Sequence, residues 1–155
     1  MHSLFLGLGS NLGDKQNNIL QSYAEIEKRI GNIVSQSAFY ITTPEGFESD
    51  NDFQNSVCKV STSLSLHQVF VEVLIIEKHL GRDSKSINGI YADRFIDIDI
   101  LMYDDFIIDT DQIIIPHPRL HLRNFVLEPF AEIAPCTVHP VLNKTIEQLK
   151  KDLTS

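Results

Sequence analysis

Two aspartates one residue apart, Asp97 and Asp99, are the side chains of this sequence best suited to chemistry. They alternate with isoleucines, and a period of two places alternate side chains on opposite faces of a β-strand. The two carboxylates therefore share one face with their Cα atoms about 7 Å apart, and their charges repel. A hard cation such as Mg²⁺, which takes one or two carboxylates together with substrate phosphates, would offset this repulsion. On the pattern alone, the solvated face of a half-buried strand is the favoured alternative.

Basic residues lie on both sides of the aspartates in the sequence. Carboxylates that bind metal beside arginines are what phosphoryl transfer requires, because cations neutralise a polyphosphate and the charge that develops on it. Ordinary solvated arginine remains open for at least one of them. The basic residues of this segment are Arg82, Lys85, Arg94, Arg119 and Arg123.

Two histidines follow the aspartate strand, His117 and His121. Pro118 prevents the regular helix that would align them, so a zinc site is the less favoured interpretation. We expect His117, beside the arginines, to donate a hydrogen bond to phosphate and His121 to be a surface residue. The chain has neither a Gly-x-x-x-x-Gly-Lys-Ser/Thr loop nor a protein-kinase signature.

The elements that must position these residues alternate between strand and helix periodicity. Strands are predicted over 3–8, 33–42, 53–62 and 94–101. Helices are predicted from Asp14 to Gly31 and from Ser65, with Gln68 as its capping box, to Gly81. This order predicts an α+β protein with a ferredoxin-like β-α-β-β-α-β antiparallel sheet and helices packed on it. The C-terminal additions are a strand or hairpin arm over 106–115, a helix over 125–133 and a helix from Thr145.

The first helix should face the core with Ile19, Leu20, Tyr23, Ile26 and Ile30, which recur at helical spacing. In the strand over 53–62, an aromatic and an amide, Phe53 and Asn55, share a face. A core position for Phe53 stays open, although the amide beside it favours a ligand.

Three glycine-bearing segments link these elements. The run GLGSNLG over 7–13 lacks the spacing of a dinucleotide-binding loop and predicts a tight strand-to-helix turn. Residues 43–52 read as a substrate loop, and residues 82–93 as a lid.

Composition limits the class of protein. The 155 residues, 43% of them hydrophobic, suit a single domain over 1–155. A net charge of −8 argues against binding of nucleic acid or anionic membrane. Cys58 and Cys136 match neither zinc spacing nor a redox motif, so we expect buried free thiols and a cytoplasmic protein. The first residues, MHSLFLG, lack the positive region and the long apolar run of a signal peptide, so we do not expect them to act as one.

Taken together, these motifs resemble the 6-hydroxymethyl-7,8-dihydropterin pyrophosphokinase family of folate biosynthesis. The resemblance covers nearly the whole chain, in the family's order. It rests on LGLGSNLG over 6–13, TPEG over 43–46, FQNSV over 53–57, RFIDIDILMY over 94–103, IPHPR over 115–119, RNFVL over 123–127 and EIAP over 132–135.

The resemblance implies Mg²⁺-dependent transfer of pyrophosphate from ATP to the pterin hydroxymethyl group, with release of AMP. It implies two Mg²⁺ ions on Asp97 and Asp99, with Arg82 and Arg94 also catalytic. It implies ATP contacts from Glu77, Arg82, Arg94, Ile100, His117 and Arg123. It implies pterin contacts from Thr43, Pro44, Gly46, Phe53, Asn55, Asp97 and Phe125, the two phenylalanines sandwiching the ring. No obligate protein partner is expected.

The chain departs from the family where Tyr91, Ala92 and Asp93 stand in place of Trp-Gly-Pro before Arg94. Gln112 and Pro118 also fall where some relatives place an arginine or a tyrosine. Two alternatives stay open: a catalytically silent pterin or nucleotide sensor, which the altered lid permits, and an RNA-binding module. The acidic charge and the paired aspartates oppose the second.

Overall fold

The computed structural model describes residues 1–42, 52–81 and 95–154. The predicted β-α-β-β-α-β order is confirmed, except that two strands, β2 and β3, stand in place of the second predicted strand. The first half comprises β1 (His2–Ser10), α1 (Lys15–Arg29), β2 (Gly31–Gln36), β3 (Tyr40–Thr42), β4 (Phe53–Thr62), α2 (Leu66–His79) and β5 (Asp97–Tyr103). The C-terminal additions comprise β6 (Ile108–Asp109), β7 (Ile114–Ile115), the short 3₁₀ helix η2 (Leu120–Leu122), α3 (Asn124–Ile133) and α4 (Ile146–Thr154).

The main sheet is antiparallel, with strand order β2-β4-β1-β5, and β3 pairs with the first residues of β4, on the same edge as β2. The prediction of one strand over 33–42 is wrong, because the chain breaks between β2 and β3 at Ser37. The Ser37 N–H donates to the Val57 carbonyl at 2.9 Å, and its Oγ accepts from the Val57 N–H at 3.0 Å. A side-chain oxygen thus replaces a ladder carbonyl, and regular pairing resumes only in β3.

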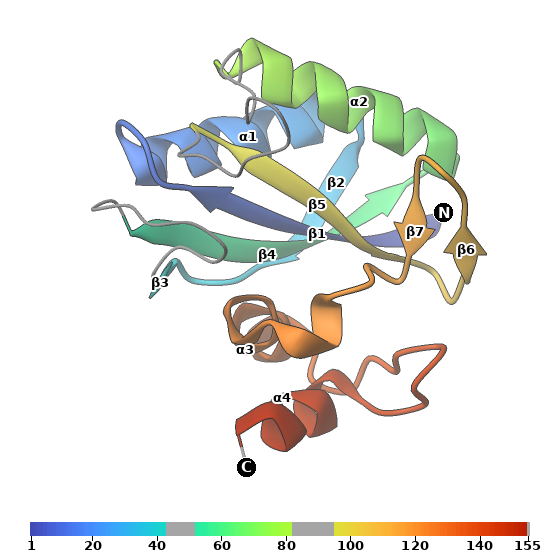
Figure 1. Cartoon of the computed structure of the whole chain (residues 1–155). Helices are drawn as coiled ribbons and strands as arrows, with labels where there is room; N and C mark the ends of the chain where they lie inside the picture. The colour runs from blue at the N-terminus through green and yellow to red at the C-terminus, as the bar shows by residue number, and fades with distance from the viewer. Residues whose placement is uncertain (43–51, 82–94, 155) are drawn as a thin grey trace.

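Helices α1 and α2 cover one face of the sheet (Figure 1). The Asp14 carboxylate accepts from the Asn17 N–H at 3.2 Å at the start of α1, and Ser65 with Gln68 forms the predicted capping box of α2. Leu20 is 47% exposed, so its predicted core position is wrong. The first core, between these helices and the sheet, includes Leu4, Leu6, Leu8, Ile19, Ile26, Cys58, Val60, Val73, Ile76, Ile98 and Ile100.

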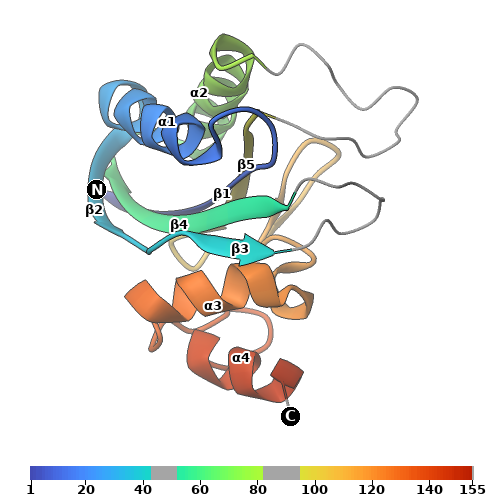
Figure 2. The same ribbon diagram turned by 90° about the vertical axis from the view of Figure 1, so that its left-hand side faces the viewer.

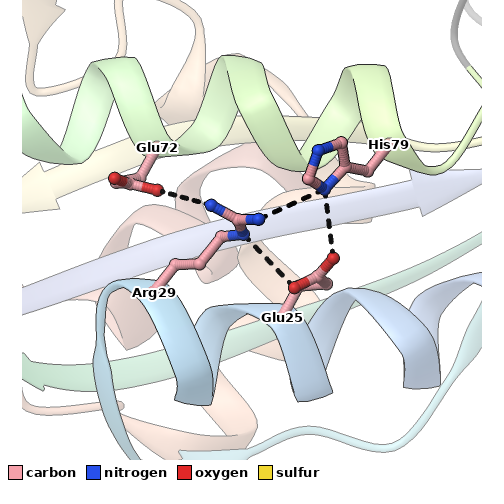
Figure 3. A network of polar contacts seen from close by, with 4 residues as sticks. All are labelled: Glu25, Arg29, Glu72 and His79. Carbon is pink, nitrogen blue, oxygen red and sulfur yellow. Dashed lines mark hydrogen bonds and ion pairs between the residues drawn. The ribbon is translucent and has the colours of Figure 1, made fainter.

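A polar network joins α1 to α2 on the outside of this helical layer (Figure 3). The Arg29 guanidinium donates to Glu25 at 3.3 Å on its own helix and to Glu72 at 3.5 Å on α2. The Nδ1 atom of His79 lies 3.4 Å from Arg29 and 3.3 Å from Glu25. The network therefore links the two helices close to the point where α2 ends.

Helices α3 and α4 lie on the opposite face, with α3 between the sheet and α4 (Figure 2). A β-bulge shapes this side: the register passes from Phe5 opposite Met102 to Leu6 opposite Ile100, so Leu101 is the extra residue. Leu101 and Met102 can therefore both enter the second core. The second core also includes Phe5, Val57, Leu120, Val126, Leu127, Phe130, Ile146 and Leu149.

The two cysteines are free, but only Cys58 is buried, so the prediction of a buried thiol is wrong for Cys136. Cys136 lies in the connection between α3 and α4 and not in an amphipathic element. Within the described ranges, no helix combines the length and apolar character needed to cross a lipid bilayer.

Candidate active site

One row of residues crosses the sheet on the side of α3. The strand registers place Tyr40 opposite Asn55, Asn55 opposite Gly9 and Gly9 opposite Asp97. Residues paired across antiparallel strands share a face, so these side chains point the same way. Asn55 and Asp97 are two strand spacings apart, about 10 Å between Cα atoms, with only a glycine between them.

The glycines of β1 are the main error of the sequence-based interpretation. Gly7 and Gly9 lie inside β1 rather than in a turn, and only Gly13, with φ of +67°, occupies the strand-to-helix turn. A Cβ on Gly9 would lie 3.1 Å from the Asn55 Oδ1 atom and 3.4 Å from the Phe53 ring. The missing side chain therefore lets Asn55 and Phe53 lean over β1. Glycine inside a strand often marks such a close approach, and that signal was present in the sequence.

The aspartates follow the predicted alternation. Asp97 and Asp99 are half-buried on the α3 side, whereas Ile98 and Ile100 belong to the first core. β5 begins at Asp97, later than predicted.

The start of α3 brings a cation and an aromatic ring to β5. The Arg123 guanidinium lies 3.8 Å from the Asp99 carboxylate and 5.4 Å from the centre of the Phe125 ring. Arg123 stands at the N-cap position and Phe125 in the first turn of α3. Fold topology thus joins the predicted phosphate-binding arginine to a predicted metal ligand.

His117 lies at the same site as a neutral hydrogen-bond donor. Burial, together with the charge of Arg123, lowers the pKa of His117 to about 4, although the charge of Asp97 acts in the opposite direction. Its Nδ1 accepts from the Arg119 N–H at 3.2 Å, so in the neutral ring Nε2 carries the proton. A second hydrogen bond, from the His117 N–H to the Leu101 carbonyl at 2.9 Å, fixes this segment on β5.

A cavity of about 300 Å³ lies on the outer side of β5. Its walls come from α2, from β5 and from the segment that contains β7, and they are largely apolar. Ile100, Glu77, His117 and Asp99 all line it, so three predicted ATP contacts and one predicted metal ligand meet there. Gln112 and Pro118, two positions where the chain departs from some relatives, line it too.

Glu77 also supports the strand. Its side chain is buried, and Oε2 accepts from the Ile98 N–H at 2.9 Å. Among the described residues β5 is an edge strand of the sheet, and this N–H would otherwise lack a ladder partner there. The carboxylate therefore holds the segment between the two aspartates in place.

The sequence can be compared with those of known protein families. The model of the 7,8-dihydro-6-hydroxymethylpterin-pyrophosphokinase (HPPK) family matches residues 5–135. The chain belongs to this family. The predicted enzyme class, a pyrophosphokinase, is therefore confirmed.

The sequences of curated HPPK family members align with most of this chain. The pyrophosphokinase of Aquifex aeolicus is 36% identical over 154 residues, which are 99% of this chain and 94% of the relative. That of Porphyromonas gingivalis is 37% identical over 141 residues, 90% of this chain and 95% of the relative. The folic acid synthesis protein FOL1 of Dictyostelium discoideum is 42% identical over 97% of this chain, which spans only 22% of FOL1.

Solved structures of HPPK proteins share the fold. The HPPK-DHPS of Plasmodium falciparum (A437G form) superposes with a TM-score of 0.79 at 18% identity, over 97% of this chain and 45% of that one. At this identity the likeness supports the predicted α+β, ferredoxin-like fold and nothing finer.

Several predicted HPPK site residues lie outside the described residues. They are Arg82 and Arg94, the segment from Tyr91 to Asp93, and the pterin contacts Thr43, Pro44 and Gly46. The other predicted site residues lie within the described residues and on three sides of the aspartates. Phe53 and Asn55 lie across β1 from Asp97, Arg123 and Phe125 lie beside Asp99, and Glu77, Ile100 and His117 line the cavity with Asp99.

The prediction of His121 as a surface residue is wrong. It is half-buried, and its ring packs edge-on against His139 with 6.2 Å between ring centres. Its buried Nδ1 has no hydrogen-bond partner among the residues that the structure describes. The fold places it beneath the connection between α3 and α4, which local sequence does not reveal.

Proposed function

We propose that the chain transfers the β,γ-pyrophosphoryl group of ATP to the hydroxymethyl group of 6-hydroxymethyl-7,8-dihydropterin, with Mg²⁺, and releases AMP. The observation that carries this proposal is the position of the aspartates. They stand between Phe53 and Asn55 of β4, from which β1 separates them, and a cavity on the outer side of β5. Arg123, whose guanidinium lies over the Phe125 ring, adjoins Asp99. Transfer from a nucleotide to a flat heterocycle brings the two substrates together at the metal ions, so their binding sites should lie on either side of the aspartates.

The pterin would bind on the Asn55 side. Phe53 and Phe125 supply flat apolar surfaces for a heterocycle, and the Asn55 amide supplies both a donor and an acceptor for its polar edge. Asn55 is 6% exposed, so hydrogen bonds that it makes to a ligand would be shielded from water. Thr43, Pro44 and Gly46 would contribute backbone contacts.

ATP would bind from the cavity. Its apolar walls, with Ile100 among them, suit a nucleobase, and its polar lining residues Asp99 and His117 would face the phosphates. The Nε2–H of neutral His117 can donate to a phosphate oxygen, and Arg123 can neutralise its charge. Arg82 and Arg94 would complete the phosphate contacts, and Glu77 would hold β5 in register.

Asp97 and Asp99 would hold two Mg²⁺ ions together with the phosphates. Within the described part of the chain, no group of three or more His, Cys, Asp or Glu side chains could hold a metal by itself. Two carboxylates, completed by phosphate oxygens and water, are the donor set that Mg²⁺ commonly uses. Bound Mg²⁺ would screen the phosphate charge and lower the pKa of the attacking hydroxyl. No side-chain nucleophile is needed, and the protein acts by orienting the two substrates.

We further propose that residues 1–155 act as a single domain, in the cytoplasm and without an obligate protein partner. Gel filtration followed by an activity assay tests the last point. The fraction that contains this protein alone should be active without an added partner.

Product analysis tests the activity itself. The protein is incubated with MgATP and 6-hydroxymethyl-7,8-dihydropterin, and nucleotides are separated by chromatography. AMP and the pterin pyrophosphate should form in equal amounts, and only with Mg²⁺ present. ADP as the product would contradict pyrophosphoryl transfer. Tight pterin binding without any AMP would instead support a silent sensor.

A further inference from the structure

A glutamate at the far end of α3 contacts the segment that leads into β3. Glu132 accepts from the Ala38 N–H with both carboxylate oxygens, at 3.2 and 3.0 Å, and from the Tyr40 hydroxyl at 2.6 Å. The residues are more than 90 positions apart in sequence. One carboxylate therefore joins α3 to the beginning of β3.

The position of Glu132 is unfavourable for a lone helix. It lies in the last turn of α3, where the helix dipole is negative, and that turn carries no basic residue. A carboxylate there is disfavoured unless other groups stabilise its charge. The bonds from Ala38 and Tyr40 do so, and a hydrogen bond from Tyr40 to Glu132 raises the pKa of Tyr40 to about 12, so the hydroxyl remains a donor.

Both elements that Glu132 joins carry residues of the proposed pterin site. α3 carries Phe125 in its first turn. β3 pairs with the part of β4 that carries Phe53 and Asn55, with Tyr40 opposite Asn55. Figure 2 shows α3 directly beneath β3 and β4. A change in the separation of α3 and β3 would therefore move one aromatic ring relative to the other.

β3 also orients the Asn55 amide. The Thr42 hydroxyl accepts from Asn55 Nδ2 at 2.7 Å, which leaves Oδ1 directed toward Gly9. If β3 shifts, this bond weakens and the amide can turn, which exchanges donor and acceptor for any ligand.

We propose that Glu132 and Tyr40 are positioning residues of the pterin site. They set the spacing between Phe125 and the pair Phe53 and Asn55, and, through β3 and Thr42, the orientation of the Asn55 amide. They touch neither substrate. This inference rests on the proposed function, since it assumes that the site on this face binds a pterin.

Four variants test it. Glu132→Ala removes all three hydrogen bonds, Glu132→Gln keeps an acceptor for the Ala38 N–H, and Tyr40→Phe removes one bond only. Glu128→Ala is the matched control, because Glu128 lies one turn earlier on α3 and accepts a hydrogen bond from Asn124 of the same helix. For each variant we would measure the pterin Kd by fluorescence, KM for both substrates, kcat and the melting temperature.

Glu132→Ala should weaken pterin binding about tenfold and leave the KM for ATP within about twofold of wild type. Tyr40→Phe and Glu132→Gln should have smaller effects in the same direction, and Glu128→Ala should have none. Tyr40→Phe added to Glu132→Ala should weaken binding no further, because the two residues act through one contact.

A lower melting temperature with an unchanged pterin Kd in Glu132→Ala and Tyr40→Phe would overturn the inference, since the contact would then only stabilise the fold. An equal loss of affinity for ATP and pterin would overturn it too. If wild type binds the pterin but forms no AMP, the proposed function fails, while the pterin Kd of the variants still decides the positioning role.

Discussion

The two faces of the sheet use the same strands for different purposes. On the face of α1 and α2, side chains of β1, β4 and β5 join one apolar core, among them Leu4, Leu6, Leu8, Cys58, Val60, Ile98 and Ile100. On the face of α3 and α4, each of these strands changes character along its length. β1 packs Phe5 and then presents Gly7 and Gly9; β4 packs Val57 and presents Asn55 and Phe53; β5 packs Leu101 and presents Asp99 and Asp97.

Antiparallel pairing explains why the polar halves coincide. The carboxyl end of β1 lies beside the amino ends of β4 and β5, so polar or small residues at these three ends meet at one side of the sheet. Substitutions on the α1 and α2 face should therefore reduce stability. Substitutions in the polar half of the other face should reduce activity and leave stability nearly unchanged.

The largest expected effect is at Asp97. Asp97→Asn should reduce kcat by at least about 100-fold, because it removes a proposed metal ligand at the centre of the charge that develops. The melting temperature should stay the same or rise slightly, since the repulsion between Asp97 and Asp99 is relieved. AMP formation and thermal unfolding measure the two quantities.

The matched control lies on the opposite face. Leu6 is fully buried in the first core, and Leu6→Ala should destabilise the fold by about 2–5 kcal/mol. At a temperature where the variant remains folded, kcat should stay near the wild-type value. Near-full activity in Asp97→Asn would remove the distinction between the two faces.

A smaller effect is expected within β1 itself. Gly9→Ala places a Cβ 3.1 Å from Asn55 Oδ1, so the amide must move, and the KM for the pterin should rise about tenfold. Gly7→Ala is the control, because its Cβ would meet Leu101 at 3.4 Å, an ordinary contact. Equal effects of the two substitutions on pterin KM would show that backbone strain in β1, and not Asn55, is responsible.

The packing on the α3 and α4 side of the sheet should also lose stability at acid pH. Burial, and then the charge of His121, lowers the pKa of His139 below its ordinary value. As pH falls below about 6.5, the unfolded chain takes up the proton first, so stability is lost in that range. His139 Nδ1 accepts from the Val141 and Leu142 N–H groups, and His139→Asn keeps an acceptor there without the titration. Its melting temperature should fall less between pH 7 and pH 5 than that of wild type; an equal fall would exclude His139 as the cause.

The smallest effect is expected on the outer surface of the helical layer. Arg29→Ala breaks the network of Figure 3, whose ion pairs are partly solvated, so it should cost less than about 1 kcal/mol. The loss should shrink at high salt, because salt screens such pairs. Chemical denaturation at two ionic strengths measures it, and kcat should not change. A fall in kcat would show that this network reaches the site through α2 and Glu77.

Much of the site could be predicted because its signals are local. Alternate residues of an extended chain point to the same face. This period alone places Asp97 with Asp99 on one face of their strand, and Phe53 with Asn55 on one face of theirs. The predicted strand over 33–42 failed because Ser37 is held by Val57, twenty positions away. No local pattern reports such a contact.

The sequence alone determined the order of strands and helices, their caps at Asp14, Ser65 and Thr145, and the polar or apolar character of each face. Only the tertiary structure decided that β1 lies between β4 and β5, and hence that Gly9 separates Asn55 from Asp97. It also decided that Glu132 reaches Tyr40 and that Arg123 reaches Asp99. The physical reason is that periodicity and capping depend on neighbours within a few residues. The partner of a strand, by contrast, is chosen by the burial of the whole core.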